Sequence, residues 1–168
     1  AAALHSLRAQ TFIDWQATLC PLDANARDIA MRAVDGDARM QIADTSDMAE
    51  ASALAHAADT NACELLCVLD GDDTLEPTAF AALMDALAEQ PDAGMAYSRH
   101  VLIDANGGVL GPGPLCELPY SADALLLDFM TGPLRVLRRQ AYRDAGGFAS
   151  AHADASDYDM CLRLSETA

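Results

Sequence analysis

An acidic turn after a short apolar run is the stretch of this sequence best suited to chemistry. Residues Leu65–Pro77 read Leu-Leu-Cys-Val-Leu-Asp-Gly-Asp-Asp-Thr-Leu-Glu-Pro, so Asp70, Asp72 and Asp73 follow five apolar residues. Mg²⁺ and Mn²⁺ prefer such oxygen ligands and commonly bridge one or two carboxylates to the phosphates of a substrate. The turn therefore predicts a site for a divalent metal and a diphosphate. A plain solvated turn is the alternative, because Asp and Gly favour turns in any case.

A second acidic cluster, Asp154, Asp157 and Asp159, precedes an apolar helix-like segment near the C-terminal end. The helix dipole stabilises acidic residues at a helix start, so capping alone can explain this cluster. A general base is also a carboxylate that is held within reach of the proton it removes. We therefore treat Asp157 as a candidate base, with helix capping as the alternative.

Local sequence indicates the elements that hold the acidic turn. The run from Leu65 to Leu69 is too short for a typical helix and predicts a strand buried on both faces of a parallel sheet. Its carboxyl end, where the acidic residues begin, is the edge at which open α/β sheets bind ligands. Pro77 suits the first turn of the next helix, which shows helical spacing of apolar residues: Phe80, Leu83, Met84 and Leu87.

Strands and helices are expected to alternate along the rest of the chain, which is typical of an α/β domain with a mostly parallel sheet. The turn at 104–108 predicts a hairpin, and Gly146-Gly147 predicts a helix end. A helix capped by Thr45 or Ser46 is expected to run to Ala58. The other expected strands are 15–20, 40–43, 94–97, 101–103, 109–110 and 134–137, and the other helices are 2–10, 25–34, 122–130, 140–145 and a last one from 157.

Composition narrows the class of protein. The 168 residues suit one domain, and the net charge of −16, with ten Arg and no Lys, argues against nucleic acid as a partner. No apolar run approaches the roughly 20 residues of a membrane-spanning helix. The five scattered Cys are expected to be reduced core residues of a cytosolic protein, without a disulfide or zinc framework.

Taken together, the motifs resemble family 2 glycosyltransferases of the GT-A fold. Leu69–Pro77 is similar to the family's Asp-x-Asp motif, and Asp157–Leu164 lies at the place of its Glu-Asp motif. Further similar pieces follow the family's order along the chain: Ser6–Trp15, Tyr97-Ser98, Leu102–Gly107, Gly132–Leu134, Arg138-Arg139 and Gly146–Phe148.

The resemblance implies one domain over 1–168 with a Rossmann-like, mostly parallel sheet flanked by helices. Residues 1–76 would form the nucleotide-binding half and 77–168 the acceptor half. The chain would begin after the family's first strand and stop before its later segment. A cytoplasmic location is implied, with any attachment to the inner face of the membrane made through parts outside this chain.

The resemblance also implies an inverting transfer of a sugar from a UDP- or GDP-type donor to a carbohydrate or lipid-linked acceptor, assisted by Mn²⁺ or Mg²⁺. Asp72 would be the main metal ligand, Asp70 would contact the metal or the ribose, and Asp73 would support the turn. Asp157 would be the base. The acceptor-side loop would be Gly146, Gly147 and Phe148, although the two glycines also suit a plain helix end.

Two alternatives remain open. In place of the family's paired aspartates and its Arg-Asn pair the chain has Pro21-Leu22 and Leu54-Ala55, which favours a non-catalytic module for carbohydrate binding or scaffolding. Val68–Leu75 also differs by one residue from the haloacid dehalogenase phosphatase signature, in which Asp70 would be a nucleophile. Asp73 in place of Gly, and the absence of Lys, argue against that phosphatase.

Overall fold

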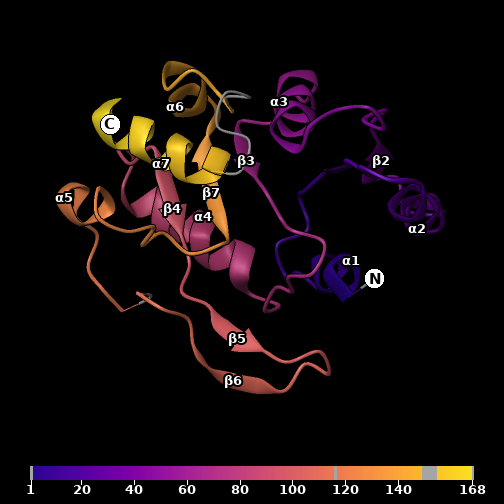
Figure 1. Cartoon of the computed structure of the whole chain (residues 1–168), viewed down its shortest axis with the longest axis horizontal. Coiled ribbons are helices and arrows are strands. Elements are labelled where there is room, and N and C mark those ends of the chain that lie inside the picture. Colours follow the sequence, from indigo (N-terminus) through magenta and orange to yellow (C-terminus); the bar gives the residue numbers. More distant parts are fainter. Residues whose placement is uncertain (1, 116, 149–154, 168) are drawn as a thin grey trace.

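Helices and strands alternate through most of the chain (Figure 1). The computed structural model describes residues 2–115, 117–148 and 155–167. No helix in these ranges is long and apolar enough to cross a membrane. The elements are α1 (Ala2–Arg8), β1 (Ala17–Leu19), α2 (Ala24–Val34), β2 (Met40–Ile42), α3 (Glu50–Thr60), β3 (Leu65–Cys67), α4 (Ala79–Glu89), β4 (Met95–Tyr97), β5 (Val101–Ile103), β6 (Val109–Pro112), α5 (Ala122–Leu125), β7 (Arg135–Arg138), α6 (Arg139–Asp144) and α7 (Ser156–Thr167).

The central sheet has the order β3-β7-β4, and β7 is antiparallel to both of its neighbours. Leu66 pairs with Leu137, and Ala96 pairs with Val136. Strands β3 and β4 therefore run in the same direction, as expected for strands joined by a crossover helix, which here is α4. The prediction of a mostly parallel sheet was wrong at this point, because β7 from the C-terminal part of the chain is inserted between them.

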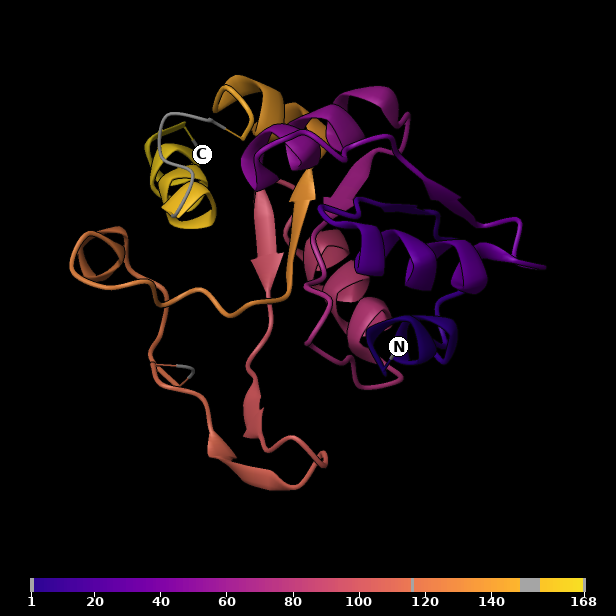
Figure 2. The same cartoon turned by 45° about the vertical axis from the view of Figure 1, so that its right-hand side comes forward.

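The other two sheets have two strands each. Strands β1 and β2 are parallel, and β5 and β6 form the predicted antiparallel hairpin, which extends away from the rest of the chain (Figure 2). Asp104 closes the hairpin turn by accepting hydrogen bonds from the backbone N–H groups of Asn106 and Gly108, both at 2.8 Å. The result is a mixed α/β arrangement of small sheets.

The two faces of β7 point into different cores, because neighbouring side chains alternate across a strand. Val136 packs with Phe80 and Leu83 of α4, and this core also contains residues of α1 and β2. Leu137 packs with Tyr142 of α6 and Met160 of α7. In Figure 2, α4 and α7 accordingly lie on opposite sides of β4 and β7. The central sheet is thus covered by helices on both faces.

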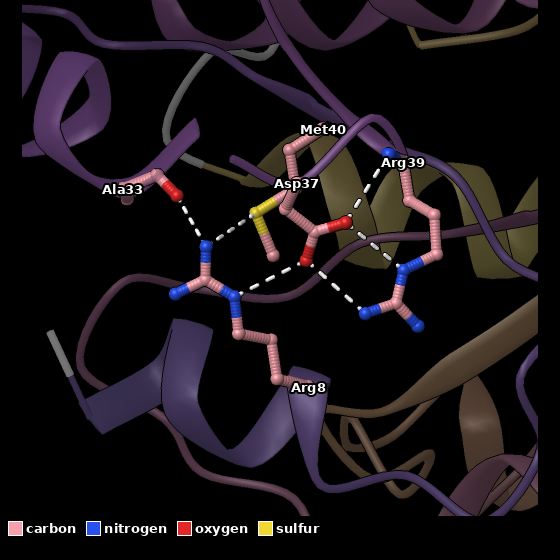
Figure 3. A network of polar contacts seen from close by, with 5 residues as sticks. All are labelled: Arg8, Ala33, Asp37, Arg39 and Met40. Carbon is pink, nitrogen blue, oxygen red and sulfur yellow. Dashed lines mark hydrogen bonds and ion pairs between the residues drawn. The ribbon is translucent and has the colours of Figure 1, made fainter. Parts of the chain in front are cut away.

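Asp37 ties the N-terminal elements together between two arginines (Figure 3). Its carboxylate accepts hydrogen bonds from Arg39 at 3.0 and 3.1 Å and from Arg8 at 3.2 Å. The Arg39 hydrogen bonds are the main reason that the pKa of Asp37 is held well below its usual range. The Arg39 guanidinium also lies over the Trp15 ring, 3.8 Å from its centroid. This network joins α1 to the loop before β2.

Arg138 and Arg139 hold the ends of two helices against the central sheet. Arg138 donates to the carbonyl of Leu87 near the end of α4 at 2.7 Å. Arg139 is buried and donates to Ala58 near the end of α3 at 2.7 Å, and also to Cys63. A cation at a helix C-terminus is favoured by the helix dipole and by the unpaired carbonyl groups there.

Some predicted boundaries were wrong. Strand β3 has only three residues, and its side chains are half-buried or exposed, so it is not buried on both faces. Helix α3 begins at Glu50 with Ala49 at the N-cap position, whereas the Thr45 hydroxyl donates to the carbonyl of Pro21 at 2.9 Å. Helix α5 ends at Leu125, well before the predicted end at 130.

The cysteines only partly match the predicted core positions. Cys161 is buried, Cys20 and Cys63 are half-buried, and Cys67 is exposed. These four are free thiols, as expected, while Cys116 lies outside the described residues. The exposure of Cys67 follows from the incomplete cover of β3.

Candidate functional site

An open cavity of about 550 Å³ lies between the end of β3 and the start of α7. Its walls come from α3, from the residues after β3, from the segment before β7 and from α7: Glu50, Leu54, Val68, Asp70, Phe129, Ala155, Ser156, Asp157 and Tyr158. The first residue of the acidic turn and the candidate base, which are far apart in the sequence, therefore border the same cavity. Its size is within the usual range of ligand-binding pockets.

Asp70 lies in a field of negative charge. Its pKa is raised, first by desolvation and then by repulsion from carboxylates on three different segments: Asp157, Asp73, Glu50 and Asp72. A bound cation would offset this repulsion.

A divalent metal at the acidic turn would need ligands in addition to the turn's own carboxylates. Among the described residues, no three His, Cys, Asp or Glu side chains are close enough together to hold a metal ion by themselves. Mg²⁺ in substrate complexes is commonly held by one or two carboxylates together with phosphate oxygens. Asp70 borders the cavity. Asp72 and Asp73 come after Asp70 in the turn, and the Asp73 N–H donates to the Asp70 carbonyl at 3.3 Å.

Asp157 is the second residue of α7 and forms an ion pair with Arg135 of β7. The Arg135 side chain is 10% exposed and that of Asp157 is 28% exposed. The contact uses Oδ2 of Asp157, and Arg135 also donates to the carbonyl of Gly132 at 2.7 Å. The carboxylate is thus held by a buried cation and lies in the first turn of a helix, where the helix dipole favours negative charge.

Two aromatic rings form part of the cavity wall beside Asp157. The rings of Phe129 and Tyr158 are stacked, with centroids 5.0 Å apart. The Tyr158 hydroxyl donates to the carbonyl of Leu125 at 2.5 Å, which ties the ring to α5. The cavity therefore combines an aromatic wall with carboxylates, a combination that suits a ligand with both apolar faces and hydroxyl groups.

Gly146 and Gly147 end helix α6. Their φ angles of 86° and 69° lie in the left-handed region that favours glycine. The Gly147 N–H donates to the carbonyl of Tyr142 at 2.9 Å, and the ring of Phe148 packs edge-on against Tyr142 at 5.4 Å. The helix end is therefore confirmed, and a role for these residues beside an acceptor stays a prediction. Phe148 and Asp157 do border one further small cavity together.

Sequence reasoning missed four residues of the cavity region: Glu50, Phe129, Arg135 and Tyr158. Arg135 had a signal, because it is the one charged residue of the expected strand 134–137, which reads Leu-Arg-Val-Leu. Tyr158 directly follows the candidate base, whereas Glu50 and Phe129 are brought to the cavity only by the tertiary fold. Asp154, of the second acidic cluster, lies outside the described residues.

Comparisons with known proteins found relatives but no matching family model. The chain is 31% identical to chondroitin synthase of Escherichia coli over 98 residues, which are 58% of this chain and 14% of that protein. It is 27% identical to the O-antigen biosynthesis protein RfbC of Myxococcus xanthus over 97% of this chain and 13% of that protein. The first two names suggest a glycosyltransferase-like family.

A third relative is the uncharacterized protein y4gI of Sinorhizobium fredii, which is 27% identical over 97% of this chain. The chain spans 14%, 13% and 18% of the length of these three relatives. The similarity to the second and third relatives covers the acidic turn, β7 and α7, because it extends over nearly the whole chain.

Proposed function

We propose that this chain is a glycosyltransferase domain that moves a sugar from a nucleotide-diphosphate donor to an acceptor hydroxyl, with inversion at the anomeric carbon. The observation that carries the proposal is the single cavity bordered by Asp70 at one side and Asp157 at another. Transfer needs both a place for the diphosphate and a base for the acceptor. The names of the relatives favour polysaccharide biosynthesis as the setting.

The donor side of the reaction is assigned to the acidic turn. Asp72 and Asp70 would hold Mn²⁺ or Mg²⁺, and Asp73 would support the turn. Such a metal, when bound, supplies Lewis-acid stabilisation of the departing nucleoside diphosphate. The repulsion that raises the pKa of Asp70 supports this assignment, because a cation would relieve it. The donor is a UDP- or GDP-sugar in this proposal. Residues 1–76 form the nucleotide-binding half of the domain.

The acceptor side is assigned to the start of α7, within the half formed by residues 77–168. Asp157 takes the proton of the acceptor hydroxyl while the acceptor oxygen forms a bond to the anomeric carbon of the donor sugar. The bond from that carbon to the phosphate oxygen breaks, and its electron pair leaves on the nucleoside diphosphate. Attack opposite the leaving group gives inversion. The acceptor is a carbohydrate or a lipid-linked sugar in this proposal.

The test compares Asp157→Asn with Asp159→Asn. Asp159 lies on the same helix but pairs with Arg163 at 2.7 Å and does not border the cavity. The measurement is nucleoside diphosphate release from common UDP- and GDP-sugars with Mn²⁺ and saccharide acceptors. Loss of the base should slow turnover by about 100-fold or more, while Asp159→Asn stays close to the wild type. Full turnover by Asp157→Asn would remove Asp157 from the mechanism.

A non-catalytic carbohydrate-binding module is the second candidate. Leu54, which stands where the family resembled by the sequence has Arg, borders the cavity and offers no charge to a phosphate. Saccharide binding by a wild-type chain that releases no nucleoside diphosphate from any donor would favour this second candidate.

A further inference from the structure

Arg135 is a cation in an unusual place, within the core strand of the central sheet. It lies between Leu134 and Val136, which are 6% and 1% exposed, and Arg135 itself is 8% exposed. Burying a guanidinium is costly unless it is paired and hydrogen-bonded. An apolar residue would fill this strand position without that cost, so the presence of an arginine here needs an explanation.

The guanidinium is held in place by contacts that do not involve Asp157. One nitrogen donates to the carbonyl of Gly132 at 2.7 Å. The guanidinium carbon lies 5.0 Å from the ring centroid of Phe129, within the range of a cation–π contact. The strand, a carbonyl group and an aromatic ring therefore hold the cation in place independently of Asp157.

Asp157 is contacted by this fixed cation at a single carboxylate oxygen. The ion pair joins Arg135 to Oδ2, and within the described ranges Oδ1 accepts no hydrogen bond. Asp157 borders the large cavity that also contains Asp70, while Arg135 lines only the small neighbouring cavity. The cation therefore lies behind the carboxylate relative to the large cavity.

We propose that Arg135 is a positioning residue for Asp157, which it reaches from β7. It fixes Oδ2 and leaves Oδ1 to take the proton of the acceptor. The proposal rests on the transferase function argued above. A small error in the position of a base can cost a large part of the rate.

The chain offers a matched control in Arg163. It forms an ion pair with Asp159 on the same helix and also donates to the carbonyls of Ala145 and Gly147. It borders neither cavity. Its loss should loosen the contact between α6 and α7 without moving the carboxylate of Asp157.

The experiment measures turnover and nucleotide binding for Arg135→Ala, Arg135→Lys and Arg163→Ala. We expect Arg135→Ala to lower kcat by about 10- to 100-fold, with the calorimetric Kd for UDP or GDP with Mn²⁺ within about twofold of wild type. Added guanidinium chloride, at concentrations that do not unfold the protein, should restore several-fold of the lost rate. Arg135→Lys keeps a cation and should fall between wild type and Arg135→Ala, so it serves if Arg135→Ala fails to fold.

Several results would overturn the proposal. An unchanged kcat in Arg135→Ala would show that the position of Asp157 does not depend on this cation. A large loss of nucleotide affinity would assign Arg135 to the donor phosphates instead. Equal rescue of Arg163→Ala by guanidinium would show a general effect of the salt. An inactive wild type removes the transferase function and this role together, whereas an active wild type with a fully active Arg135→Ala removes only the role of Arg135.

Discussion

Replacing Asp70 by Asn should make the folded protein more stable while it weakens the proposed metal and donor site. The ionised carboxylate of Asp70 is disfavoured by desolvation and by the surrounding carboxylates, which raise its pKa. Asn is nearly the same size and has no charge. Because Asp70 is solvent-exposed, screening limits the gain in the free energy of unfolding to about 1 kcal/mol at most. For a chain of this length the corresponding rise in Tm is roughly 2 to 4 °C.

The stability difference between Asp70→Asn and the wild type should depend on pH in one direction. A carboxyl group with a raised folded-state pKa destabilises the folded state above that pKa, and the penalty disappears as the pH falls and the group takes up a proton. The advantage of Asp70→Asn should therefore be present at pH 7 and vanish at about pH 3, below the ordinary pKa of Asp. Thermal unfolding followed by circular dichroism at both pH values measures the difference.

Asp85→Asn is the control for this prediction, since it also removes one negative charge. Asp85 is exposed on α4 and does not border the cavity. High salt should reduce the advantage of Asp70→Asn, because it screens exposed charges. Equal Tm values for the two variants at pH 7 would refute the argument that carboxylates are crowded around Asp70.

Two further predictions concern the elements that hold the site. Arg139→Met should lower the free energy of unfolding by about 2 to 3 kcal/mol, because it removes charged hydrogen bonds to the carbonyl of Ala58 in α3 and to that of Cys63 in the following loop. Urea unfolding measures the loss, and a loss below about 0.5 kcal/mol would contradict the prediction. Gly147→Ala should destabilise more than Gly36→Ala by about 1 kcal/mol. Both glycines have positive φ, but a Cβ at Gly147 would lie 3.0 Å from the Tyr142 hydroxyl, whereas one at Gly36 meets nothing within 4 Å. Equal losses of stability would show that Tyr142 moves aside freely.

Features fixed by a few neighbouring residues could be predicted from the sequence. The hairpin follows from the turn at Asp104, the helix α4 from the spacing of its apolar residues, and the end of α6 from Gly146 and Gly147. The start of α7 also matches its acidic residues to within one position. In each case the residues that determine the element lie close together in the sequence.

Features that depend on distant segments could not be predicted in this way. The insertion of β7 between β3 and β4 is decided by packing on both faces of β7, which no local pattern encodes. The same holds for Glu50, the first residue of α3, because only the tertiary fold brings it to the cavity that Asp70 borders. Arg135 could be noticed as the one charged residue of the expected strand 134–137, but its partner Asp157 lies 22 residues away.

The proposed function depends most on the binding of a nucleoside diphosphate to the acidic turn through a divalent metal. Calorimetric titration with UDP and with GDP, in the presence and absence of Mn²⁺, tests it most directly when wild type, Asp72→Ala and Asp85→Ala are compared. We predict binding of at least one nucleotide that requires Mn²⁺, is lost in Asp72→Ala and is kept in Asp85→Ala. Binding that needs no metal, binding that survives in Asp72→Ala, or no binding of either nucleotide by the wild type would contradict the claim.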